Sequence, residues 1–432
     1  MTYLTNIMSL FNFLRFSPSP PKAKPQEVSF DLVTNHVTTP CPESEATPRV
    51  PATGIPLEIV LSILEMSSMD DNNTSNTELL ATCSLVCKAW SLHAQKLLFR
   101  RVQLCSQAAY NSFTSAVDRS TERGRALGDS VVQMRVLLDN NQPGPLKQIS
   151  FATAVALCPN LRELNLALYG CGDPGKDIVG SPALERMRRP APSFDQTTLE
   201  LLRGGPSITS LHFSNWSDND HSIVQLVDIW PSLDSLSITG KTPHLSPGLT
   251  HAPYTCQLER IKFNCQVEPS LDFLEWLLRT SAEAQSLRAI ELEREPSLEM
   301  LEYLVGNHGE GLRTLALPSC VTREHANAVI KCERLRELRT ERAFTCPVVF
   351  RQLPKGIKAF AFGMDQDTPL QYVVEAVKTR DELECVTVNI WNQGEKHAQL
   401  AALKMACAFR GVELCITNDV RVYRAMMALA RL

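Results

Sequence analysis

The sequence lacks most of the features that mark enzymes, metal-binding proteins and membrane-spanning proteins. No apolar stretch in its 432 residues approaches the roughly 18–20 residues that a membrane-spanning helix needs. The motifs G-x-S-x-G and H-E-x-x-H, which are typical of serine hydrolases and zinc proteases, do not occur. The formal net charge of −4 is small and argues against a nucleic-acid-binding surface. We therefore expect no enzyme activity, no cofactor or metal, and no nucleic-acid partner.

Cysteine is frequent, but its spacing fits neither a zinc site nor a disulfide framework. None of the 14 cysteines forms a C-x-x-C pair, and the nine histidines are scattered. Several cysteines, such as Cys158, Cys256 and Cys332, stand where a small apolar residue would serve. The pattern favours reduced, buried thiols in a cytoplasmic or nuclear protein.

The amino-terminal segment, 1–53, is predicted to be disordered and rich in proline. Its first sixteen residues are apolar with Arg15 as their only charge, and they lack the basic start and the small-residue cleavage site of a secretory signal. A short helix lying on a membrane is the alternative for these sixteen residues. Residues 17–53 carry eight prolines and almost no apolar periodicity.

A repeated pattern dominates the chain from residue 131 onward. Three apolar residues spaced h-x-x-h-x-h recur eight times, and a ninth, degraded unit keeps only Leu335 and Leu338. From Ile208 onward the intervals are 22–29 residues. This spacing is typical of leucine-rich repeats, whose period is about 20–29 residues. The first apolar residues of the nine units are Leu161, Ile208, Leu233, Leu258, Leu287, Leu312, Leu335, Ile357 and Leu383. Val131 fits as the start of an opening strand, and residues 412–416 fit as a closing one.

The intervals between these strands have a helical period. Leu271, Leu274 and Leu278, for example, fall on one helical face. Each unit therefore reads strand, turn, helix, and a single unit buries too little surface to fold alone. We predict an α/β solenoid over 131–432, with a parallel sheet on its concave side and helices outside.

One interval is about twenty residues too long. The distance from Leu161 to Ile208 is 47 residues, and the excess, 169–195, is rich in Gly, Pro and Arg. We interpret it as an inserted loop that is either disordered or part of a binding surface. Part of it resembles a phosphate-binding loop, but Pro174 lacks an N–H and Asp177 stands where a hydroxyl is required.

Residues 54–104 are predicted to form a small helical module, followed by a connecting helical segment over 105–130. Pro56 suits the first turn of a helix, and Thr77 suits the cap of a second one. Three short helices make a marginal core, so the module is expected either to share its apolar surface with a partner or to cap the solenoid.

The module resembles the F-box. The stretches IPLEIVLSILEM and LLATCSLVCKAW follow the F-box pattern Leu-Pro-x-Glu-Ile-x-x-x-Ile-Leu and Leu-x-x-x-x-x-Val-(Cys/Ser)-(Lys/Arg)-x-Trp. Ile55 replaces the usual leucine, and residues 67–76 lengthen the first loop. With the repeats behind it, the chain is similar to F-box/leucine-rich-repeat proteins, particularly those of large fungal families.

This resemblance implies the substrate-recognition subunit of a Skp–cullin–F-box ubiquitin ligase. The module would bind the Skp adaptor and, through it, cullin, while the repeats would hold a protein substrate for ubiquitin-dependent degradation. The alternative is a repeat-scaffold binding protein that does not recruit a ligase. The Skp-facing residues, some of which must instead fill the module's own core, would come from Pro56, Ile59, Ile63, Leu64, Leu79, Val86 and Trp90.

Five of the nine repeats place a cation directly after the first apolar residue of the strand. These substrate-binding candidates are Arg162, Arg288, Arg313, Arg336 and Lys358. Equivalent positions of stacked strands align about 4.8 Å apart, so the last four should form an unbroken basic column. Either nearby acids such as Glu163, Glu291 and Glu337 neutralise it, or it grips an acidic or phosphorylated segment of the substrate.

Overall fold

The computed structural model describes residues 56–68, 76–170, 192–217, 219, 221–245, 254–343 and 345–429. The chain divides into two compact units, Met1–Leu98 and Phe99–Leu432. The amino-terminal segment predicted to be disordered, 1–53, lies outside the described residues, as does most of the predicted insertion.

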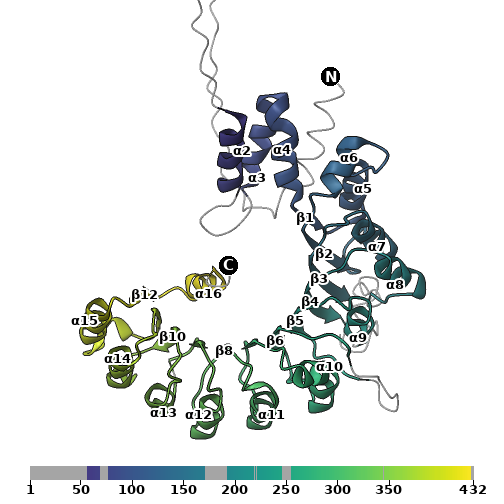
Figure 1. Cartoon of the computed structure of the whole chain (residues 1–432). Helices are drawn as coiled ribbons and strands as arrows, with labels where there is room; N and C mark the ends of the chain where they lie inside the picture. The colour runs from purple at the N-terminus through teal and green to yellow at the C-terminus, as the bar shows by residue number, and fades with distance from the viewer. Residues whose placement is uncertain are drawn as a thin grey trace, which may run out of the picture. The chain divides into compact units, whose positions relative to one another are not determined.

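Three helices form the described part of the first unit (Figure 1): α2 (Leu57–Met66), α3 (Thr77–Val86) and α4 (Lys88–Phe99), the last of which ends one residue into the second unit. Their common core contains Val60, Leu64, Cys83 and Ala94. Asn76, and not the predicted Thr77, caps α3, because its side chain accepts the Leu79 N–H at 3.3 Å while Thr77 is already helical.

The second unit contains an open sheet of twelve described strands, all parallel and in chain order. The strands are β1 (Arg101–Leu104), β2 (Gln133–Asp139), β3 (Glu163–Gly170), β4 (Ser210–Ser217), β5 (Ser235–Gly240), β6 (Arg260–Cys265), β7 (Ala289–Leu292), β8 (Thr314–Leu317), β9 (Glu337–Thr340), β10 (Ala359–Met364), β11 (Cys385–Ile390) and β12 (Glu413–Thr417). The predicted solenoid-like α/β class with a parallel sheet is confirmed.

Helices connect these strands and cover one face of the sheet (Figure 1). They are α5 (Gln107–Ala116), α6 (Glu122–Gly128), α7 (Gln148–Ala156), α8 (Gln196–Arg203), α9 (Ser222–Val227), α10 (Leu271–Glu283), α11 (Leu298–His308), α12 (Arg323–Ile330), α13 (Pro347–Arg351), α14 (Leu370–Thr379) and α15 (Leu400–Arg410), with a 3₁₀ turn at Gly394–Lys396. The last helix, α16 (Val420–Leu429), lies on the opposite, concave face of the sheet (Figure 1).

The repeat array begins earlier than the sequence predicted. Strand β1 pairs in parallel with β2, and α5 and α6 form the helical half of this first repeat. The side chains of Phe113 and Leu127, on these two helices, are fully buried. The predicted boundary at residue 131 is therefore wrong. Residues 105–130 are helical as predicted, but they connect β1 to β2 inside the array. The alternation of Val102 and Leu104 already indicates a strand, but the step of 32 residues from Val102 to Met134 of β2 is longer than the period of about 20–29 residues typical of these repeats.

The core lies between the strands and the outer helices. Alternate strand residues point into it and are buried, as with Leu164, Leu166 and Leu168 of β3. Aromatic rings join neighbouring repeats: Phe350 packs edge-on against Phe360 and Phe362, with ring centroids 5.4 and 5.6 Å away. Each repeat thus buries its apolar face against the next one.

The end of the predicted insertion belongs to the fold. Asp195 caps α8 by accepting the Thr198 N–H at 2.8 Å. Phe194 is buried and packs against Phe151, with ring centroids 6.3 Å apart. Residues 171–191 of the insertion lie outside the described residues.

Candidate functional site

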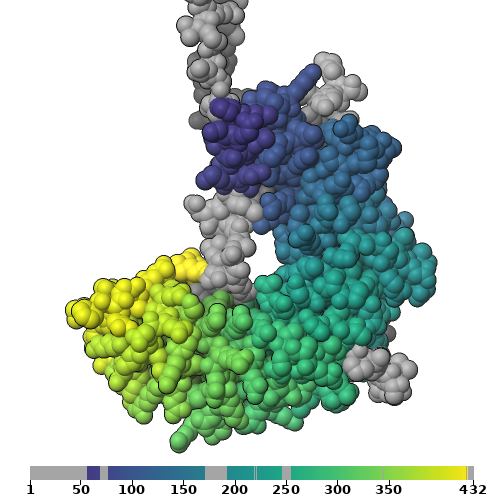
Figure 2. All heavy atoms as spheres, viewed as in Figure 1, coloured from purple at the N-terminus to yellow at the C-terminus, as the bar shows by residue number. Residues whose placement is uncertain are grey.

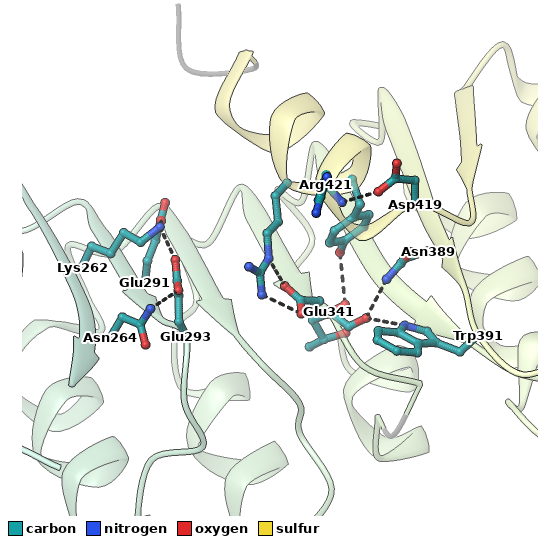
Figure 3. A network of polar contacts seen from close by, with 12 residues as sticks. Lys262, Asn264, Glu291, Glu293, Glu341, Asn389, Trp391, Asp419 and Arg421 are labelled. Carbon is teal, nitrogen blue, oxygen red and sulfur yellow. Dashed lines mark hydrogen bonds and ion pairs between the residues drawn. The ribbon is translucent and has the colours of Figure 1, made fainter. Parts of the chain in front are cut away.

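The concave face of the repeat unit carries a group of charged side chains on β6–β9 (Figure 3). On β6, the Lys262 Nζ lies 3.7 Å from a carboxylate oxygen of Glu291 and 2.5 Å from one of Glu293. Asn264 donates to the other oxygen of Glu293 at 2.5 Å. These groups lie on the concave face because strand residues alternate between the core and this face.

Helix α16 adds a second group of contacts on the same face (Figure 3). Arg424 donates from Nε and Nη2 to the two carboxylate oxygens of Glu341, at 2.6 and 2.9 Å. The hydroxyl of Tyr423 donates to the Thr340 carbonyl at 3.1 Å. Hydrogen bonding to Glu341 raises the pKa of Arg424, and burial raises the pKa of Tyr423, so neither group titrates near neutral pH.

The backbone carbonyl of Glu341 is fixed from the other side. The Trp391 Nε1–H donates to it at 2.9 Å, and the Asn389 amide donates at 3.3 Å (Figure 3). Glu341, which binds α16, is thus held by contacts from the β11 repeat as well as by the β9 repeat to which it belongs. A rigid carboxylate of this kind binds an arginine with both of its oxygens.

A pocket of about 140 Å³ lies between α16 and strands β6–β9. Its polar lining includes Lys262, Glu291, Glu293, Arg339 and Glu341, with Arg424 and Tyr423 from the helix. Pockets for small-molecule ligands usually enclose about 300–1,000 Å³, so this one suits a single side chain of a protein partner better than a metabolite.

The predicted basic column is aligned as expected. The N–H of Arg313 donates to the carbonyl of Arg288, that of Arg336 to Arg313, and that of Lys358 to Arg336, at 2.7–2.8 Å. The N–H of the next residue along each strand also donates to that carbonyl: Thr314 to Arg288, Glu337 to Arg313, and Ala359 to Arg336. The column therefore follows the amino-terminal edge of the strands. Arg162 belongs to the same edge but stands apart, because Thr209, Asp234 and Glu259 separate it from Arg288.

The acids that were expected to neutralise the column contact other residues. Glu291 pairs with Lys262, and Glu337 accepts from Arg339 Nε at 2.6 Å. Glu163 accepts from Gln133 at 2.6 Å. At the ends of the column, Arg288 donates to the Gly311 carbonyl at 3.0 Å, and Lys358 pairs with Glu384 at 2.6 Å.

The middle of the column carries free positive charge. The side chains of Arg313 and Arg336 are exposed, and neither forms an ion pair with any residue that the structure describes. Two adjacent, unpaired guanidinium groups repel each other and attract an anionic ligand.

In the helical module, the structure separates the seven candidate Skp-binding residues by burial. Pro56, Ile59, Ile63 and Val86 are exposed, with 52 % of Ile59, 51 % of Ile63 and 58 % of Val86 accessible to solvent. Leu64 is only 4 % exposed and belongs to the module's own core, so it is not available to a partner.

The other two candidates, Leu79 and Trp90, are partly buried against that core. Sequence reasoning missed four exposed apolar residues of the module, Leu57, Met66, Leu85 and Leu92. The signal for Met66 was present, because Ile59, Ile63 and Met66 follow an i, i+4, i+7 spacing on α2.

Comparison with known proteins gives no family. No protein-family model matches the chain, and no curated protein is significantly similar to it. None of the helices in the described ranges is long and apolar enough to cross a membrane. Within those ranges, no cluster of three or more His, Cys, Asp or Glu side chains is placed to hold a metal ion.

Proposed function

We propose that the protein is the substrate-recognition subunit of a Skp–cullin–F-box ubiquitin ligase, built as an F-box followed by leucine-rich repeats. The observation that carries this proposal is the exposed apolar stripe on α2. This helix buries Val60 and Leu64 on one side and exposes Ile59, Ile63 and Met66 on another. A helix that is apolar on both sides needs a second packing partner.

The module offers its partner more than one helix. At the end of α3, Leu85 and Val86 are 52 % and 58 % exposed. These residues, together with Pro56, Ile59 and Ile63, fall within the stretches that resemble the F-box. The Skp adaptor, which the resemblance implies as the partner, would bind these apolar side chains.

The repeat unit supplies the substrate-binding half of the proposal. Arg313 and Arg336 form no ion pair within the described ranges, and Arg288 and Lys358 extend the same column. This column would bind an acidic or phosphorylated segment of the substrate, with Arg162 outside the continuous part. Cullin would be reached only through the adaptor.

Capture of the Skp adaptor by the full chain tests the proposal. Ile59→Asp should reduce capture at least tenfold, since a charge would be placed in an apolar interface. Val321→Asp is the matched control, because Val321 is 55 % exposed and lies in the repeat unit. Equal capture by both variants, or no capture by the unmodified chain, would favour the scaffold protein that recruits no ligase.

A further inference from the structure

The last repeat of the array leaves apolar side chains uncovered. In β1–β11 the two core-facing residues of each strand are buried, but in β12 Leu414 and Ile416 are only half-buried. On α15, Met405 is 70 % and Phe409 is 91 % exposed. These residues belong to the yellow end of the repeat unit in Figure 2. Terminal repeats of soluble solenoids normally present a polar outer face, so this end is unusual.

The backbone of the same repeat also has an unpaired edge. Among the strands that the structure describes, β12 is the last in the sheet and pairs only with β11. Glu413 donates its N–H to the Glu384 carbonyl, so the N–H and C=O groups of 413, 415 and 417 face β11. Those of Leu414 and Ile416 face outward, where no described strand meets them. An exposed row of such groups accepts another strand.

The sequence of β12 is complementary to itself. In an antiparallel pair centred on Cys415, Leu414 of one copy lies opposite Ile416 of the other, and their outward N–H and C=O groups hydrogen-bond. Glu413 then lies opposite Thr417, so a carboxylate meets a hydroxyl and no like charges face each other. The apolar side chains of both copies fall on the helix side of the joined sheet.

We propose that two copies of this chain associate through β12 and α15 around a two-fold axis at Cys415. The two sheets join into one antiparallel pair at the axis. Met405 and Phe409 of each α15 cover the junction with their counterparts. The contact is isologous, so it closes at two copies and forms no fibre. This proposal is independent of the function proposed for the helical module.

Light scattering of the full chain measures the association. The unmodified chain should have the mass of a dimer at micromolar concentrations, and Phe409→Asp should shift the dissociation constant at least tenfold toward monomer. Phe409 is 91 % exposed, so this change leaves the fold intact. Val267→Asp, at a residue 68 % exposed elsewhere in the repeat unit, should leave the dimer unchanged. A monomer at every concentration, or a dimer insensitive to Phe409→Asp, would overturn the proposal.

Oxidative cross-linking tests the register. Cys415 would form the non-hydrogen-bonded pair on the axis, where Cα atoms lie about 4.5 Å apart, within the disulfide range of about 4.4–6.8 Å. Mild oxidation should give a reducible dimer that is lost in Cys415→Ser and retained in Cys87→Ser, which removes the exposed thiol of the helical module. A dimer that does not cross-link through Cys415 would show that another surface holds it.

Discussion

The guanidinium of Arg424 meets the carboxylate of Glu341 with two hydrogen bonds, across 83 residues of sequence. This pair and the buried Tyr423 hydroxyl hold α16 on the concave face. Helix α16 therefore covers part of the concave face of the sheet, whereas the rest of this face remains open to a partner.

We predict that Arg424→Ala loosens the attachment of α16, which Tyr423 still holds, without unfolding the repeats. Arg424 is half-exposed, so its coupling to Glu341 should be about 1 kcal/mol or less. Hydrogen exchange should become faster in Val420–Leu429 and remain slow in β9. The double variant with Glu341→Gln should lose little more stability in α16 than Arg424→Ala alone, because either change already breaks the pair. Additive effects of the two substitutions would contradict the pairing.

Leu64 and Ile63 should respond differently to truncation, although they are neighbours in the F-box-like stretch. Leu64→Ala empties a core position and should destabilise the helical module by about 2–4 kcal/mol. Ile63→Ala removes an exposed side chain and should cost less than about 0.5 kcal/mol while weakening capture of the adaptor. Hydrogen exchange of α2–α4 at increasing denaturant concentration measures the stability of this module and separates the two effects; equal losses would contradict this assignment.

Reversing one charge in the basic column should stabilise the fold. Arg313 lies between Arg288 and Arg336, and no acid in the described part of the chain pairs with it. Arg313→Glu should therefore raise stability by up to about 1 kcal/mol at low ionic strength. The gain should disappear in about 1 M salt. The control substitution, Lys262→Glu, should lower the stability, because Lys262 forms ion pairs with Glu291 and Glu293. Thermal unfolding at two salt concentrations measures both, and destabilisation by Arg313→Glu would show that the column is neutralised.

His308 should make the repeat unit sensitive to acid. It is buried in α11, and burial lowers its pKa from 6.5 to about 4. Since the pKa is lower in the folded chain than in the unfolded chain, the stabilising contribution is complete above pH 6.5 and is lost as the pH falls toward 4. The full loss corresponds to about 3 kcal/mol. His308→Leu should flatten the dependence of unfolding free energy on pH in this window; an unchanged slope would exclude His308 as the cause.

Local periodicity was sufficient to predict the strands, because each h-x-x-h-x-h unit depends only on neighbouring repeats. The same reasoning placed Arg288, Arg313, Arg336 and Lys358 in one column. The sequence prediction failed where the burial of a side chain depends on residues distant in the chain. The burial of Leu64 and the exposure of Ile63 depend on how α3 and α4 pack against α2, and both residues fit the same apolar pattern.

Helix α16 was missed for the same reason. Thr417 and Asp419 give a turn signal after the closing strand, and Asp419 accepts the Arg421 N–H at 2.8 Å, but the position of the helix depends on Thr340 and Glu341. The sequence prediction paired the acids with the cations nearest to them in the chain. In the structure, Glu291 instead pairs with Lys262 of the preceding strand, β6.

The contacts of α16 have a consequence for the order of folding. Each repeat packs on its neighbours, but α16 must reach back over β10–β12 to Thr340 and Glu341 on the β9 repeat. Closing so long a segment has an entropic cost that is offset only after the intervening strands have stacked. A shift of the array by one repeat would displace Glu341 by about 4.8 Å from Arg424 and prevent docking. Attachment of α16 therefore comes last, and it requires that the final four repeats have already assembled in the correct register.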